Sequence, residues 1–186
     1  MKKNCIINDY VVDGIKDPEN KIKRIFVIYF ERNKQKYFLR NLSDTTCDNS
    51  VFIYMKITKP RRLGSTKQYI SMLQVVFSVN VIESSLNISI VKNLKSDDKL
   101  TFSFEPKDSP ISIGRGDCTI KLAHPSLSKL HCSIIFNKSS KCWEIRDGYG
   151  DRNSTNGTWL MINSKHEIDD ETFVKIGNNT FRISVT

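Results

Sequence analysis

Long apolar runs are missing from this 186-residue sequence. No stretch approaches the roughly 18 to 20 consecutive apolar residues that span a bilayer, and the start has no apolar segment typical of a secretory signal. Glycine and proline are also scarce, at 8 and 5 residues, which excludes collagen-like and low-complexity chains. We therefore expect an intracellular globular protein, cytoplasmic or nuclear, that has no membrane partner.

Spacings typical of metal sites and of common catalytic motifs are missing as well. The five cysteines include no C-x-x-C pair, and no His/Cys spacing suits zinc. An odd cysteine count without a secretory signal favours reduced thiols. The sequence contains no P-loop, no nucleophile elbow, no H-E-x-x-H and no dinucleotide fingerprint. We expect no enzymatic activity, no metal ion and no organic cofactor.

Positive charge is concentrated in the first half of the chain. Residues 1–83 contain 15 Lys/Arg and 8 Asp/Glu, a net charge of +7, whereas residues 84–186 contain 14 and 12, a net charge of +2. A basic surface favours an anionic partner such as nucleic acid or a phosphorylated protein. A solvated surface with a compositional bias toward lysine is the alternative. The cluster Lys59, Arg61, Arg62 and Lys67 is open to both interpretations.

Short stretches of alternating apolar and polar residues dominate, and long helical periods are absent. Leu86, Ile88 and Ile90 are separated by polar residues, and turn residues divide one such stretch from the next. Many short strands separated by turns indicate an antiparallel β-sandwich or barrel. The expected strands are 23–30, 36–42, 51–57, 69–81, 86–90, 100–104, 111–113, 132–136, 142–145, 158–162, 172–176 and 180–185, with a basic loop at 59–68.

The two halves of the chain resemble each other in two places. One set of matches has a separation of 106 residues and the other a separation of 104. The pairs are Tyr37/Trp143, Leu39/Ile145, Arg40/Arg146, Ile70/Val174, Met72/Ile176, Phe77/Phe181 and Val79/Ile183. Either the chain contains a degenerate repeat, or alternating strands look alike by coincidence. In a repeat, the first copy would lack one or two opening strands.

Three loops of the second half are rich in anion-binding donors. They are I-G-R at 113–115, S-K-L-H at 128–131 and S-T-N-G-T-W at 154–159. Each has an ordinary explanation as a turn when taken alone. Together with W-x-I-x-D at 143–147 and the closing I-G…F-x-I at 176–183, their order resembles the forkhead-associated (FHA) domain family. The resemblance covers about residues 84–186.

The resemblance implies an antiparallel β-sandwich whose loops at one end bind phosphothreonine peptides. Arg115 would supply a guanidinium for the phosphate, and Lys129 a second positive charge. The hydroxyl groups of Ser128 and Thr155 would donate to phosphate oxygens, and the Asn156 amide would bind the peptide backbone.

Three further residues would support this site structurally. In the resembled family the equivalent of His131 is buried and braces the phosphate loops, so we do not expect it to be catalytic. Gly157 fits a position that requires a positive φ, and Gly114 allows a sharp turn before Arg115.

We therefore expect an FHA domain at 84–186, preceded by a smaller, basic, β-rich and FHA-like segment at 1–83 that packs on it. The first half lacks the phosphate-binding residues, since Ile25 replaces the histidine and D-N-S-V at 48–51 replaces T-N-G-T. The expected function is a non-enzymatic adaptor that binds a phosphothreonine-containing protein. The alternatives are a scaffold subunit of a larger assembly that does not use phosphate and, less favoured, nucleic-acid binding through the basic first half.

Overall fold

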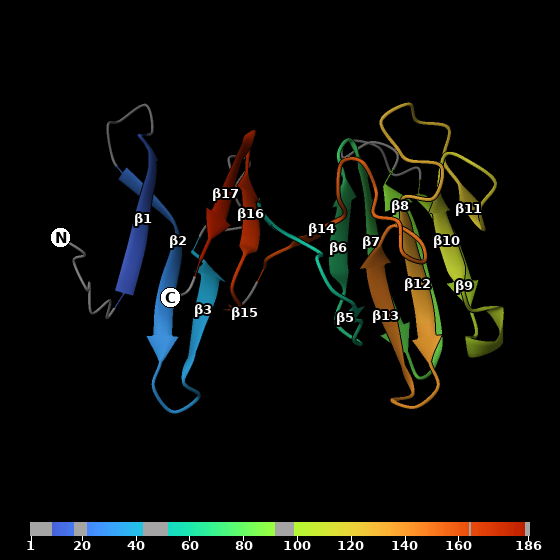
Figure 1. Cartoon of the computed structure of the whole chain (residues 1–186), viewed down its shortest axis with the longest axis horizontal. Coiled ribbons are helices and arrows are strands. Elements are labelled where there is room, and N and C mark those ends of the chain that lie inside the picture. The colour runs from blue at the N-terminus through green and yellow to red at the C-terminus, as the bar shows by residue number, and fades with distance from the viewer. Residues whose placement is uncertain (1–8, 17–21, 43–51, 92–98, 164, 185–186) are drawn as a thin grey trace. The chain divides into compact units, whose positions relative to one another are not determined.

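The computed structural model describes residues 9–16, 22–42, 52–91, 99–163 and 165–184. Seventeen β-strands dominate this part of the chain, and one short 3-10 helix spans Pro106–Asp108 (Figure 1). None of the described residues form a helix long and apolar enough to cross a membrane. The expected all-β class with antiparallel sheets is confirmed.

The chain divides into two compact units. Unit 1 contains both ends of the sequence, Met1–Met55 and Ile162–Thr186, and unit 2 contains Lys56–Met161. This division differs from the boundary expected between residues 83 and 84, which falls in the tight turn between two paired strands of unit 2. Part of the basic first half thus belongs to the same unit as the predicted phosphate-binding loops.

Unit 2 contains two groups of neighbouring strands. The order in the first group is β11 (Ile120–Lys121), β10 (Ile111–Gly114), β12 (Cys132–Asn137), β13 (Cys142–Asp147) and β5 (Arg61–Arg62). The order in the second is β14 (Trp159–Met161), β6 (Gln68–Met72), β7 (Val75–Ile82), β8 (Ser85–Val91) and β9 (Lys99–Phe104). The described pairings are antiparallel except that of β10 with β11.

The core of unit 2 follows from the alternation seen in the sequence. Leu86, Ile88 and Ile90 in β8 are buried, and the intervening residues are more exposed, as a strand with one face on the core requires. Trp143 in β13 is the largest fully buried side chain, and its ring meets that of Phe136 edge-on at 5.3 Å between centroids.

Unit 1 also contains two groups of strands. The first runs in the order β1 (Asp9–Lys16), β2 (Ile22–Glu31), β3 (Lys36–Asn41) and β15 (Lys165–Ile168). The second runs in the order β17 (Asn179–Ile183), β16 (Thr172–Ile176) and β4 (Ile53–Lys56), although Lys56 itself belongs to unit 2. Buried side chains of this unit include Leu39, Ile53, Met55, Ile162 and Val174.

Three local expectations differ from the structure. The single strand expected at 69–81 is the hairpin β6–β7, because Leu73 adopts a φ of +59° at a turn that has no glycine, proline or asparagine to mark it. The basic loop contains the short strand β5, and β1, β11 and β15 form where no strand was expected. Residues 25 and 48–51, compared above with the phosphate-binding residues, have no described side chains.

Candidate functional site

Strand direction brings the three predicted loops to one end of unit 2. Ile113 pairs with Cys132, which in turn pairs with Asp147, so β10 ends where β12 begins and β13 ends. The loops that follow β10, precede β12 and follow β13 therefore meet at this end (Figure 1). These loops contain seven of the eight predicted binding and supporting residues, and the eighth, Gly114, is the last residue of β10.

Ser128 and Thr155 lie side by side although 27 residues separate them. The Thr155 backbone N–H donates to Ser128 Oγ at 3.0 Å, and Ser128 Oγ donates to Thr155 Oγ1 at 3.4 Å. Thr155 is exposed and Ser128 half-buried. Two hydroxyl groups are thus held within reach of one ligand.

Asn156 joins the same two loops by a second contact. The side-chain Nδ2 of Asn156 donates to the carbonyl oxygen of Ser126 at 2.9 Å, and the backbone carbonyl of Asn156 accepts from Trp159 Nε1 at 3.1 Å. Ser126 Oγ and His124 Nδ1 are 2.6 Å apart. The side-chain amide is exposed but already oriented, which reduces the entropy lost when a ligand binds.

The His131 side chain is fully buried and connects the loop that contains Ser128 to the loop that contains Gly157. The Ser128 N–H can only donate, so Nδ1 at 3.1 Å accepts, and Nε2 carries the proton that it donates to the Gly157 carbonyl at 3.2 Å. Burial lowers the pKa of His131, although the Gly157 hydrogen bond and the negative charge of Asp147 oppose that shift. The imidazole is therefore neutral, and its role is to hold the two loops together.

Asp147 anchors the loop that contains Thr155 and Asn156. Its Oδ1 accepts from Ser154 Oγ and from Thr158 Oγ1, both at 2.7 Å, and its Oδ2 accepts from the Ser154 N–H at 3.1 Å. Ser154 Oγ accepts from the Gly157 N–H at 2.9 Å. The sequence analysis did not assign roles to Asp147, Ser154 and Thr158, although all three lie in the motifs that it singled out.

The two glycines of the site are required for different reasons. Gly157 has a φ of +77°, which confirms the expected left-handed conformation. The φ of Gly114 is not positive. A glycine is required there because neighbouring backbone atoms leave no room for a Cβ, and not because of a sharp turn. A Cβ there would lie 2.8 Å from the Ser128 carbonyl oxygen, 2.9 Å from the His131 nitrogen and still closer to the Lys129 carbonyl oxygen.

Arg115 and Lys129 are exposed on adjacent strips of backbone. The Arg115 N–H donates to the Ser128 carbonyl at 3.0 Å, and the Gly116 N–H donates to the Lys129 carbonyl at 3.0 Å. The backbone of both residues therefore lies next to Ser128, one of the two residues that form the hydroxyl pair. Within the described residues, no three His, Cys, Asp or Glu side chains gather as metal ligands.

Comparison with known families identifies this region. Residues 111–179 match the family model of the FHA domain. This match agrees with the resemblance that the motifs indicated, and FHA domains are non-enzymatic modules that bind phosphorylated protein partners. No curated protein and no solved structure matches the chain. Residues 162–179 of the matched region lie in unit 1.

Proposed function

We propose that unit 2 binds phosphothreonine peptides through Arg115, Ser128, Lys129, Thr155 and Asn156, and that the protein acts as an adaptor. The observation that carries this proposal is the contact of Ser128 Oγ with the backbone and side chain of Thr155, with the exposed residues Arg115 and Lys129 on neighbouring backbone. A phosphate dianion is bound best by several donors and positive charges in a preorganised frame.

The surrounding hydrogen bonds support this role because they fix the frame before the ligand arrives. Asp147 accepts hydrogen bonds from groups inside the loop at 154–158, and His131 connects that loop to Ser128. The exposed groups that remain are a guanidinium, an ammonium, hydroxyl groups and an amide. All of them can donate to phosphate oxygens or to a peptide carbonyl.

The test is binding of the full chain to an oriented library of phosphothreonine peptides. We expect selection of a defined motif that is lost with unphosphorylated peptides and weakened tenfold or more by Arg115→Ala, since charge-assisted hydrogen bonds contribute about 1.5 to 3 kcal/mol. Lys138→Ala is the matched control, because Lys138 is an exposed cation in the turn at the other end of β12. Absence of phosphate-dependent selection by the folded protein would refute the proposal.

A scaffold function is the second candidate, and one observation favours it. Phe181 in β17 is a large apolar side chain that is 48% exposed at the edge of its group of strands. A strand at the edge of a sheet presents backbone N–H and C=O groups that can pair with a strand of a partner. Nucleic-acid binding stays a lesser alternative, and a strongly salt-dependent affinity without sequence preference would distinguish it.

A further inference from the structure

The hairpins β2–β3 and β12–β13 have the same register. Phe30 pairs with Tyr37 in unit 1, and Phe136 pairs with Trp143 in unit 2, with 106 residues between equivalent positions. The aromatic contact is also repeated, at 4.9 Å between ring centroids in unit 1 and 5.3 Å in unit 2. Coincidental similarity of alternating strands does not account for both.

A second pair of hairpins repeats in the same way. Ile70 pairs with Phe77 across β6–β7, and Val174 pairs with Phe181 across β16–β17. Equivalent residues are 104 positions apart. The order of the strand pairs along the chain is therefore the same in both halves.

The strands that pair with β3 and with β13, however, come from the opposite half of the chain. In unit 1, Leu39 of β3 pairs with His166, which comes from the second half. In unit 2, Ile145 of β13 pairs with Arg61, which comes from the first half. Arg61 and His166 are equivalent at a separation of 105, so each copy uses the other copy's strand at the same position.

Two backbone hydrogen bonds, one in each unit, are also equivalent to each other. The Ile57 N–H donates to the Thr158 carbonyl at 2.9 Å in unit 2, and the Ile162 N–H donates to the Ile53 carbonyl at 2.7 Å in unit 1. Ile57 and Ile162 are both buried. Each donor and each acceptor is related to its equivalent by the same 105 residues.

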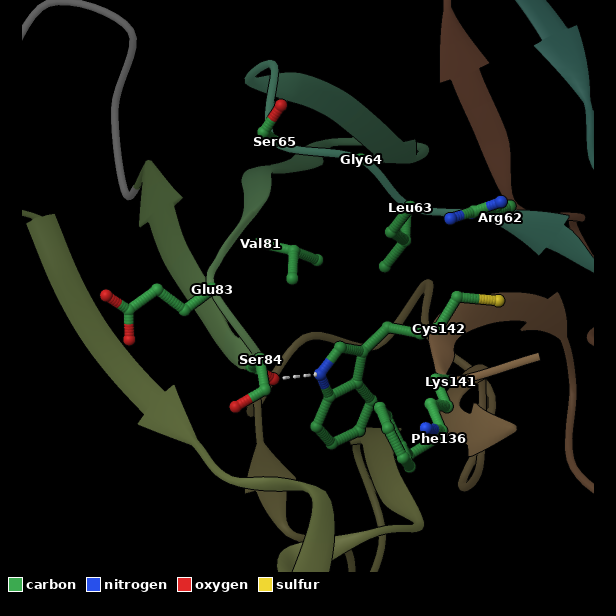
Figure 2. Close-up of a pocket in the computed structure, with 11 residues that line it drawn as sticks. Arg62, Leu63, Gly64, Ser65, Val81, Glu83, Ser84, Phe136, Lys141 and Cys142 are labelled. Atoms are coloured by element: carbon green, nitrogen blue, oxygen red, sulfur yellow. Dashed lines mark hydrogen bonds between the residues drawn. The ribbon is translucent and has the colours of Figure 1, made fainter. Parts of the chain in front are cut away.

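Residues 61–82, which belong to the first half of the sequence, form part of the core of unit 2 (Figure 2). The Leu63 N–H donates to the Trp143 carbonyl at 2.8 Å, and the Val81 N–H donates to the Gly64 carbonyl at 2.9 Å. Leu63 is only 3% exposed, and its equivalent in unit 1, Ile168, is only 5% exposed. The Trp143 indole donates to the Ser84 carbonyl at 2.7 Å across the hollow between these segments.

We infer that the chain is a duplicated β-sandwich whose two copies exchange their closing strands within one molecule. Residues 57–82 complete the copy that contains the phosphate-binding loops, and residues 162–183 complete the other copy. The first half is thus no appendage to an FHA domain at 84–186, because it contributes β5, β6 and β7 to the sandwich that carries the site.

Cysteine cross-linking in the full chain distinguishes the exchanged arrangement from a self-closed one. Lys165 pairs with Arg40 in unit 1, and the equivalent of Arg40 in the second half is Arg146. A short thiol-to-thiol cross-linker should therefore link the cysteines of Arg40→Cys/Lys165→Cys within one chain and should not link those of Arg146→Cys/Lys165→Cys. The linked peptides are identified by mass after digestion.

Two results would overturn the inference. One is an intrachain link in Arg146→Cys/Lys165→Cys, and the other is a link in Arg40→Cys/Lys165→Cys that appears only in covalent dimers. If either double variant does not fold, a second set provides the same comparison. Arg62→Cys/Glu144→Cys should link in the exchanged protein, and Glu144→Cys/Glu167→Cys should link in a self-closed one.

A separate observation concerns Lys56, a first-half residue that lies against the binding loop. The Cε and Cδ atoms of its side chain lie 2.8 and 3.6 Å from the point where a Cβ on Gly157 would stand. The adjacent Ile57–Thr158 hydrogen bond fixes its backbone at this place. Its side chain is half-buried, and the Cε atom that lies against Gly157 carries the ammonium group.

We propose that Lys56 selects peptides with an acidic residue next to the phosphothreonine. This proposal rests on the proposed function of the site. An ammonium on a flexible stem beside a peptide-binding amide is suited to a carboxylate whose exact position varies. It adds a third positive charge to those of Arg115 and Lys129.

The test compares two phosphothreonine peptides, one with acidic and one with neutral flanking residues, by calorimetry on the full chain. Lys56→Met keeps the apolar stem and should weaken binding of the acidic peptide about two- to fivefold, with a smaller effect on the neutral peptide. Lys56→Arg should retain the preference, and Lys138→Met should change neither affinity. Equal behaviour of Lys56→Met and Lys138→Met, with binding still dependent on phosphate and Arg115, would refute this proposal alone.

Discussion

Phe77 and Phe181 occupy equivalent positions in the two repeated hairpins, yet Phe77 is fully buried and Phe181 is 48% exposed. In unit 2, β7 lies between β6 and β8, and Phe77 pairs with Ile90 of β8. Among the described strands of unit 1, β17 pairs with β16 alone. Within the described residues, β17 is thus the edge strand of its group, whereas β7 is an interior strand.

Substitution of the two phenylalanines should therefore have unequal effects on stability. Phe77→Ala should lower the free energy of unfolding by about 3 to 5 kcal/mol, because it removes a fully buried ring from a packed core. Phe181→Ala should change it by less than about 1 kcal/mol. Chemical unfolding followed by circular dichroism measures both, and an equally large loss for Phe181→Ala would show that something covers that side chain.

A methyl group at Gly114 should disturb the binding loops. The added Cβ would clash with three backbone atoms of residues 128–131, so Gly114→Ala should cost about 1 to 3 kcal/mol of stability and weaken phosphopeptide binding. Gly64→Ala is the matched control in the same unit, since no atom lies within 4 Å of a Cβ there. Thermal unfolding and peptide titration check both variants; unchanged binding by Gly114→Ala would contradict the crowding argument.

Removal of the charge on Asp147 should loosen the loop that contains Thr155. In Asp147→Asn the amide oxygen can still accept from Ser154 Oγ and Thr158 Oγ1, but the NH2 group then faces the Ser154 N–H, so a donor–donor contact replaces one of the three hydrogen bonds. We expect phosphopeptide affinity to fall about tenfold, which corresponds to the roughly 1 to 3 kcal/mol lost when buried hydrogen bonds are left unmade. The exposed Asp151, in the loop between β13 and β14, provides the control Asp151→Asn. Equal affinities of the two variants would remove Asp147 from the binding frame.

His131 should make stability depend on pH. Its pKa in the folded protein is lowered by burial, whereas an unfolded histidine titrates near 6.5. As the pH falls below that value the unfolded chain takes up the proton first, so the contribution of His131 is complete above about pH 6.5 and is lost as the pH decreases toward the folded pKa. Unfolding free energies from pH 7.5 to 5 should decrease more steeply for the wild type than for His131→Gln. Parallel curves would contradict this assignment.

Much of the site was predictable because its chemistry lies in short motifs. The glycine in S-T-N-G-T marked a left-handed turn, and φ at Gly157 has the expected sign. The exact contacts were not predictable. Ser128 and Thr155 belong to loops that meet only because β12 and β13 pair in one register, and Lys56 reaches the site from a strand 100 residues away.

Local pattern determined most of the longer strands and the order of the binding motifs, because alternating apolar residues need one buried face wherever they lie. It could not determine which strand completes which sandwich. Leu63 and Ile168 are both aliphatic residues followed by polar ones, so either could pack beside Trp143 or Tyr37. The choice depends on long-range backbone pairing, such as that of Ile57 with Thr158 and of Ile162 with Ile53, in which side-chain pattern has no part.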